Sequence, residues 1–130
     1  MKVLLDTDVL VDHLRSADSP WSSLLDSIQR RRSTGYISVV TVAELHAGKL
    51  MSQPGVRAGT VRFLELFRRV PIQESIAVRA GTLLREHGED GLALADALIA
   101  ATALALRVPL LTRNRKHFER VRGLLFHPKS

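Results

Sequence analysis

Apolar residues in this chain fall into short continuous runs that alternate with longer stretches of helical periodicity. The short runs are bounded by polar or turn-forming residues, as the buried strands of a parallel sheet are. They cover residues 2–5, 36–40, 70–72, 109–112 and 124–126. The pattern therefore predicts about five strands.

The stretches between these runs carry apolar residues three and four positions apart, which is the spacing of one helix face. Thr7 or Asp8 fits the N-cap of the first helix, and Ser19 with Pro20 fits the start of the second. Further helices are expected from residue 41 to about 51, around 61–67, from about 76 to near 88, and over 92–106. The last of these is apolar on nearly all sides, so we expect it to be buried.

Strands that alternate with helices indicate an α/β fold with a mostly parallel central sheet covered on both faces. The 130 residues fit one compact domain, 1–130, and no repeat or linker divides them. In such a sheet, binding sites form beyond the carboxyl ends of the strands. Side chains that follow the predicted strands are therefore the first candidates for function.

Three acidic residues lie in apolar surroundings at these positions. Asp6 follows the first strand, Glu44 lies just after the second, and Asp96 lies in the first turns of the apolar helix. Burying such carboxylates is unfavourable, and three that converge repel one another unless a proton or a cation intervenes. The sequence thus predicts a divalent-metal site and a hydrolase that acts through metal-activated water. Asn114 follows the fourth strand and is expected at the same edge.

Each acid also has a structural explanation. Asp6 fits a helix cap, although Asp8 offers the same cap and leaves Asp6 without an obvious structural task. Glu44 completes a capping box with Thr41, so its spacing supports capping and metal ligation equally. Asp96 in a first turn is favoured by the helix dipole, which is compatible with ligation. Spacing alone leaves these alternatives open.

The composition limits which metal ligands, location and partners are expected. The chain has no cysteine, which excludes disulfides and thiolate ligands, and oxygen ligands favour Mg²⁺, with Mn²⁺ as a substitute. No stretch reaches the roughly 18–20 apolar residues that cross a bilayer, and the first residues lack a signal-peptide pattern. We therefore expect a cytoplasmic protein without a membrane partner. The formal net charge of +6 favours a polyanionic partner.

Basic residues flank Asn114 at the rim of the predicted site. Arg113 and Arg115 are placed to hold substrate phosphates beside the metal, although a solvated basic loop explains each of them equally well. His117 lies close to Asn114 in the chain and is a weaker candidate for a role near the site.

Four segments of the chain, in this order and at these distances, resemble the PIN-domain family, specifically its VapC-type toxins of bacterial and archaeal toxin–antitoxin pairs. They cover residues 4–10, 38–45, 95–103 and 111–118. The resemblance spans almost the whole chain. It implies a PIN-like three-layer α/β/α sandwich and a magnesium-dependent endoribonuclease that hydrolyses RNA. It also implies neutralisation by a cognate antitoxin and, usually, a homodimer.

The resemblance extends to single residues. Asp6, Glu44 and Asp96 match the family's three principal acids and are the expected metal ligands. The family's fourth acidic position falls at Asn114, where this chain has a neutral amide. The departure favours one well-held ion over a full two-metal site.

Two further residues are expected to support these ligands. Thr112 matches a small hydroxyl residue of the family and is expected to position Asp6 or a water. Asp8 stands where the family often has asparagine or serine, so it adds a negative charge beside the site.

Two other classes of protein compete with this interpretation. One is a weakly active or inactive PIN-like module that binds or regulates together with an antitoxin, because Asn114 replaces an acid. The other is a phosphorylation receiver domain, which also gathers acids at a sheet edge. The run at 70–72 is followed by Gln73 and Glu74 rather than by a phospho-acceptor aspartate, so the receiver domain ranks last.

A homodimer or an antitoxin complex needs a contact surface. Large apolar side chains between two predicted elements would form an exposed patch suited to either partner. The residues expected in this patch are Trp21, Phe63, Leu66 and Phe67.

Overall fold

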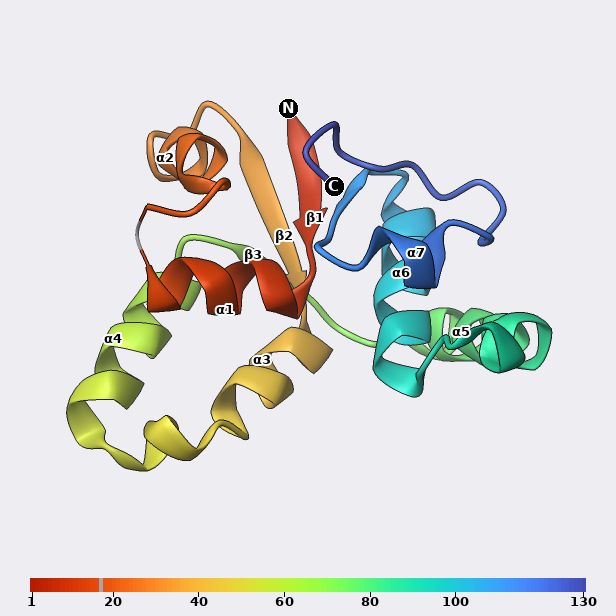
Figure 1. Ribbon diagram of the computed structural model, residues 1–130, viewed down its shortest axis with the longest axis horizontal. Coiled ribbons are helices and arrows are strands. Elements are labelled where there is room, and N and C mark those ends of the chain that lie inside the picture. The colour runs from red at the N-terminus through yellow and green to blue at the C-terminus, as the bar shows by residue number, and fades with distance from the viewer. Residues whose placement is uncertain (17) are drawn as a thin grey trace.

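A parallel sheet lies between two layers of helices in the computed structural model, which describes residues 1–16 and 18–130 (Figure 1). The strands are β1 (Lys2–Leu5), β2 (Thr34–Ser38), β3 (Arg68–Val70) and β4 (Leu110–Leu111). The helices are α1 (Thr7–Arg15), α2 (Ser22–Gln29), α3 (Val39–His46), α4 (Pro54–Leu64), α5 (Glu74–His87), α6 (Leu94–Leu106) and α7 (Arg115–Phe118), with short 3-10 turns η1 (Lys49–Ser52) and η2 (Gly88–Asp90). The predicted three-layer α/β architecture is confirmed.

The strand order is β3-β2-β1-β4, and every pair is parallel. The chain lays down β1, β2 and β3 in one direction and then places β4 on the opposite side of β1. The order therefore reverses between β1 and β4, and a crevice forms beyond the carboxyl ends of strands at such a reversal. About five strands were predicted and four are found, because the run at 124–126 contributes only a single bridge from Phe126 to Leu110.

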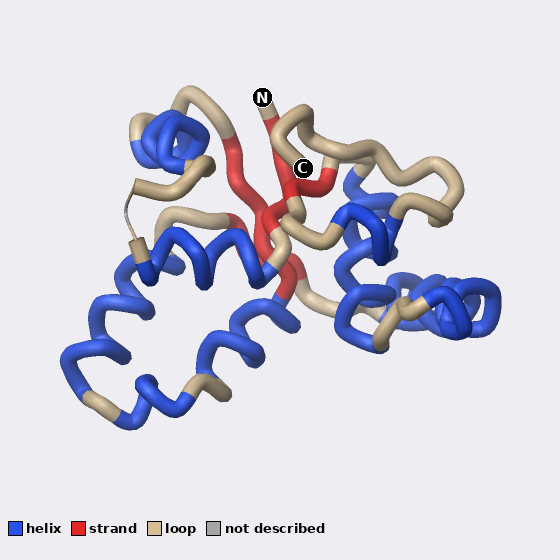
Figure 2. Tube along the Cα trace, viewed as in Figure 1, coloured by secondary structure: helices blue, strands red, loops and turns tan. Residues whose placement is uncertain are grey.

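Both faces of the sheet are buried, which explains why its strands are apolar without alternation. Val3 and Leu5 of β1 pack into a core with α1 and α2, whereas Leu4 packs into the core that contains α5 and α6. All three side chains are fully buried. Figure 2 shows the sheet running between these two groups of helices.

Helix α6 is buried along most of its length, as predicted. Ala97, Ala100 and Ala101 are fully buried and share a core with Ala80 and Leu83 of α5. Small side chains on α6 let α5 pack closely against it. This packing fixes the amino-terminal end of α6, which carries Asp96.

Strands β2 and β3 end earlier than predicted, for local reasons. Strand β2 ends at Ser38 because its hydroxyl accepts a hydrogen bond from the Val40 amide at 3.0 Å and caps α3. Strand β3 covers residues 68–70 rather than 70–72, in register with β2, and ends before Pro71, which has no amide hydrogen to donate.

Helix starts differ as well, and two of them show the reason in their hydrogen bonds. Asp6, rather than Thr7 or Asp8, is the N-cap of α1. Helix α2 begins at Ser22 rather than Pro20, because the Ser19 carbonyl accepts from the Ser22 amide and hydroxyl in a preceding turn.

The predicted apolar patch is largely internal. Trp21 and Phe67 are each only 6% exposed, and Phe63 is half-buried against the same core. Leu66 alone of the four is clearly exposed, at 39%. The prediction of an exposed patch there was wrong because these side chains complete the core beneath α2 and α4. No helix within the described residues is both long and apolar enough to cross a membrane.

Candidate active site

An open pocket of about 340 Å³ lies at the carboxyl ends of β1 and β4, where the strand order reverses. It gathers side chains from α1, from α3, from the first turn of α6 and from the loop after β4. The residues that line it are Asp6, Thr7, Asp8, Val11, Arg15, Glu44, Asp96, Arg113 and Asn114. All three predicted acids and the amide therefore meet in one place, although they lie up to 108 residues apart in the chain.

Asp6 is the deepest of these acids, at 6% exposure. The Thr7 amide donates to its Oδ1 at 2.8 Å, and the Thr112 hydroxyl donates to its Oδ2 at 2.8 Å. The prediction that Asp6 lacks a structural task was wrong, because it caps α1 through the first of these bonds. Each carboxylate oxygen offers two acceptor sites, so both oxygens retain capacity toward the pocket.

The Asp6 carboxyl resists ionisation in this environment. Burial, and then the negative charge of Asp8, raise the pKa of Asp6 to about 7, against the lowering effect of its two hydrogen bonds. The charge of Asp96 acts in the same direction with a smaller effect. A bound cation would reverse this balance, since it would stabilise the ionised form of Asp6.

Thr112 stands directly behind Asp6. Its side chain is fully buried, and its hydroxyl accepts from the Asn114 amide at 3.0 Å while donating to Asp6. Its own amide donates to the Ser130 hydroxyl at 3.1 Å. The strand end, the loop and Ser130 together fix the donor that orients Asp6.

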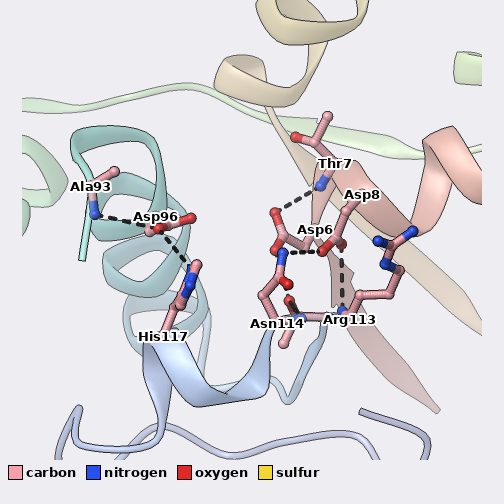
Figure 3. Close-up of polar contacts among 9 residues, drawn as sticks. Asp6, Thr7, Asp8, Ala93, Asp96, Arg113, Asn114 and His117 are labelled. Atoms are coloured by element: carbon pink, nitrogen blue, oxygen red, sulfur yellow. Dashed lines mark hydrogen bonds and ion pairs between the residues drawn. The ribbon is translucent and has the colours of Figure 1, made fainter. Parts of the chain in front are cut away.

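Asp8 and Asn114 form the outer part of the same side of the pocket (Figure 3). The Asn114 side-chain amide donates to Asp8 Oδ2 at 2.8 Å. Burial raises the pKa of Asp8, and the Arg113 amide, which approaches Asp8 Oδ1 at 3.5 Å, opposes that shift. The amide of Asn114 thus faces a carboxylate and leaves its carbonyl oxygen as its only acceptor.

Asp96 lies on the opposite side of the pocket, on α6 (Figure 3). Its Oδ2 accepts from the Ala93 amide at 3.3 Å, so Asp96 reaches back to the start of its own helix. The His117 ring places Nδ1 3.7 Å from the same oxygen. His117, the weaker sequence candidate, therefore borders the site through Asp96.

Glu44 is exposed on α3 and has no capping role. Ser38 caps that helix, so the capping alternative that the spacing of Thr41 and Glu44 left open is excluded. Instead, the Thr7 hydroxyl donates to Glu44 Oε1 at 2.6 Å. Sequence reasoning missed this role of Thr7, because residues 37 positions apart carry no local signal of contact.

The two predicted substrate-binding arginines point in different directions. Arg113 lines the pocket, but its guanidinium pairs with Asp12 of α1. Arg115 lies with its guanidinium carbon 4.5 Å from the centre of the Phe126 ring, in a cation–π contact outside the acidic pocket. Asp12 was missed as a partner because it lies 101 positions from Arg113 in the chain, and such a separation carries no local signal of contact.

The donors in the pocket suit a hard divalent cation. They are carboxylate and amide oxygens, which Mg²⁺ and Mn²⁺ prefer. Within residues 1–16 and 18–130, no three acidic or histidine side chains stand close enough to ligate one ion directly. A divalent ion bound there would therefore take only one or two carboxylates directly and fill its other positions with water.

A fold with acids gathered where the strand order reverses belongs to the class of small α/β domains that bind a ligand at this edge of the sheet. The sequence profile of the PIN domain matches residues 3–124, and the chain belongs to the PIN-domain family. The resemblance that four short segments indicated is thereby confirmed.

The relatives narrow the class to VapC-type proteins. Ribonuclease VapC10 of Mycobacterium tuberculosis is 37% identical over 118 residues, covering 89% of this chain and 85% of the relative. The crystal structure of VapBC2 from Rickettsia felis, bound to a DNA fragment from its promoter, matches with a TM-score of 0.81 and 26% identity over 98% of both chains. A toxin–antitoxin complex from Klebsiella pneumoniae matches with a TM-score of 0.72 and 28% identity over 95% of both chains.

Proposed function

We propose that the chain is a magnesium-dependent endoribonuclease and the toxin of a toxin–antitoxin pair. The observation that carries the proposal is the single pocket in which Asp6, Glu44 and Asp96 meet. It lies in a PIN domain whose curated relatives include a named ribonuclease. An oxygen-lined, partly buried acidic pocket suits metal-assisted hydrolysis of a phosphodiester better than it suits an anionic ligand alone.

We assign the cation to Asp6 and Asp96, with Glu44 contacting it through water. A bound Mg²⁺ supplies Lewis acidity and lowers the pKa of a water molecule. Thr112 and the Thr7 amide hold Asp6 from the protein side, so its remaining acceptor sites face the pocket. In the reaction, water adds to phosphorus, one P–O bond to a ribose oxygen breaks, and that oxygen takes up a proton. Asn114 contributes no negative charge, which favours one bound ion over two.

RNA would approach over the loop after β4. Arg115 and Lys116 are exposed there, and they border a second hollow that also includes Arg113 and His117. Arg113 is balanced by Asp12, so we assign the larger share of phosphate contact to Arg115. Because the proposed substrate is RNA, we also propose that the protein acts in the cytoplasm.

The proposed antitoxin would find a suitable surface beside the acidic pocket, where the two hollows share Val11 and Arg15. An apolar groove of about 610 Å³ lies between α1, α3, η1 and α4. Leu50 and Leu14, which line it, are 63% and 43% exposed. We propose that an amphipathic antitoxin segment covers this groove, and that Leu50→Glu weakens antitoxin binding measured by calorimetry while RNA cleavage is retained. Unchanged affinity would exclude the groove as the antitoxin site.

We also propose that the chain forms a homodimer, which sedimentation equilibrium would detect.

The decisive experiment compares wild type with Asp96→Asn on RNA in Mg²⁺ and in chelator. Asparagine keeps an acceptor for the Ala93 amide, so the start of α6 should be preserved while the ligand charge is lost. We expect wild-type cleavage only with Mg²⁺, and at least about a hundredfold loss in the variant. Undiminished cleavage by Asp96→Asn would sink the assignment. Absence of both Mg²⁺ binding at millimolar concentration and RNA cleavage in wild type would favour the binding module, for which Asn114 is the supporting feature.

A further inference from the structure

Glu44 is exposed at the rim of the pocket, yet its carboxylate has a close partner within the protein. The Thr7 hydroxyl lies 2.6 Å from Glu44 Oε1 and 2.9 Å from the Thr41 hydroxyl. Thr41 is fully buried, one helical turn before Glu44 on α3. Three side chains from two helices are therefore in hydrogen-bonding contact at one edge of the pocket.

The number of available hydrogens decides which group donates in each of these hydrogen bonds. A hydroxyl has one hydrogen to donate and two lone pairs that accept. Glu44 as a carboxylate can only accept, so the Thr7 hydrogen must go to Glu44, in a charge-assisted bond of the short type. Thr41 must then donate to Thr7. The chain of bonds runs from Thr41 through Thr7 to Glu44, and successive bonds of this kind polarise one another.

Thr7 also touches the second carboxylate of the pocket. Its backbone amide donates to Asp6 Oδ1 at 2.8 Å, while its hydroxyl donates to Glu44 Oε1. Thr7 is the first residue of α1, and Asp6 is the cap of the same helix. One residue thus sets the positions of two acids that come from different parts of the chain.

We propose that Thr7, supported by Thr41, is a positioning residue for metal binding. It holds Glu44 by Oε1, so that Oε2 would be left to accept from a water of an ion bound in the pocket. The inference rests on the proposed function, because it assigns Thr7 a task only if the pocket binds a divalent ion. Side chains that orient a ligand in this way typically change metal affinity by about 10–100-fold when removed.

The competing explanation is that the threonines merely join α1 to α3. A structural bond would change stability without changing metal affinity. Thr7→Val removes the hydroxyl at nearly constant shape, and Thr7→Ser restores it. Thr102→Val is the matched control, because Thr102 is fully buried in α6 and its hydroxyl donates only to the Leu98 carbonyl of its own helix.

The test is Mn²⁺ affinity of the RNA-free protein by titration calorimetry, alongside KM and kcat for RNA. For Thr7→Val we expect about tenfold weaker Mn²⁺ binding and a matching rise in the metal concentration that gives half-maximal cleavage. Thr7→Ser and Thr102→Val should stay within about twofold of wild type. Thr41→Val should fall between these limits.

A double-mutant cycle shows whether Thr7 acts through Glu44. In a Glu44→Gln background, Thr7→Val should cause little further loss of Mn²⁺ affinity. Wild-type affinity in Thr7→Val, or an equal loss with and without the Glu44 carboxylate, would overturn the inference while leaving the nuclease intact. If wild type binds no Mn²⁺ and cleaves no RNA, the proposed function fails and the inference fails with it.

Discussion

The two sides of the pocket differ in how the fold holds their acids. On the strand side, Asp6 is buried and receives two hydrogen bonds, and its backbone amide donates to the Leu111 carbonyl across the β1–β4 pair. On the helix side, Glu44 is exposed and Asp96 half-buried, and each is oriented by a contact at a helix start. The strand side therefore holds one acid in a buried position that disfavours its ionised form. The helix side presents two acids that are more exposed to solvent.

Removing the strand-side charge should have the largest effect. Asp6→Asn should reduce RNA cleavage by at least about a thousandfold, because it deletes the deepest proposed ligand. Glu44→Gln, on the exposed side, should lose only about tenfold to a hundredfold. Rates measured at saturating Mg²⁺, with circular dichroism as the check of folding, compare the two. Equal losses of RNA cleavage in the two variants would contradict the proposed difference between the two sides of the pocket.

The buried acid also predicts a pH dependence of stability without metal. The pKa of Asp6 is raised from 3.8 to about 7, so the folded state keeps a proton that the unfolded chain releases in this range. The free energy of unfolding should therefore fall as pH rises from about 4 to 7, by up to about 4 kcal/mol from this group. Asp6→Asn should lack that component.

Urea unfolding in chelator at pH 5 and pH 8 measures this difference. Wild type should lose more stability between the two pH values than Asp6→Asn, and Mg²⁺ should restore part of the loss at pH 8. The same fall in both proteins would mean that Asp6 is not the group responsible.

Placing an acid at position 114 should have a smaller effect than removing the charge of Asp6. Asn114→Asp places a carboxylate where an amide now donates to Asp8, so the metal-free protein should lose about 1–2 kcal/mol of stability. Mn²⁺ should bind several-fold more tightly or with a second equivalent. Calorimetry against the neutral control Asn114→Ala reports both, and an unchanged stoichiometry and affinity would count against Asn114 as the fourth member of the site.

The smallest effects on RNA cleavage are expected for Arg113 and Arg115, which follow β4. Arg115→Ala should raise KM for RNA a few-fold with kcat nearly constant, as loss of one exposed phosphate contact does. Arg113→Ala should change KM less, since its guanidinium is already paired with Asp12. Steady-state kinetics at two salt concentrations separates them, and a larger effect at Arg113 would reverse our assignment.

Sequence patterns predicted the layers of the fold and the meeting of the acids, because continuous apolar strands and acids at their ends depend on local composition. They misplaced the caps. Asp6 caps α1 and Ser38 caps α3, since a residue that closes a strand can also open the next helix, and spacing does not show which side chain reaches the amide.

Contacts between distant segments could not be predicted in the same way. The bond from Thr7 to Glu44 and the pairing of Arg113 with Asp12 depend on how α1 packs against α3 and the β4 loop. The final strand was overpredicted because its apolar run makes only one bridge, at Phe126. Tertiary packing, rather than local preference, decided each of these cases.

Cleavage of RNA in heavy-oxygen water tests the central claim most directly. If the acidic pocket activates water for attack on phosphorus, the new phosphate end carries one solvent oxygen, detected by mass spectrometry, and no 2′,3′-cyclic phosphate forms. The label should require Mg²⁺ and disappear with Asp6→Asn. A cyclic phosphate product, or labelled product formed equally by Asp6→Asn, would contradict hydrolysis at this site.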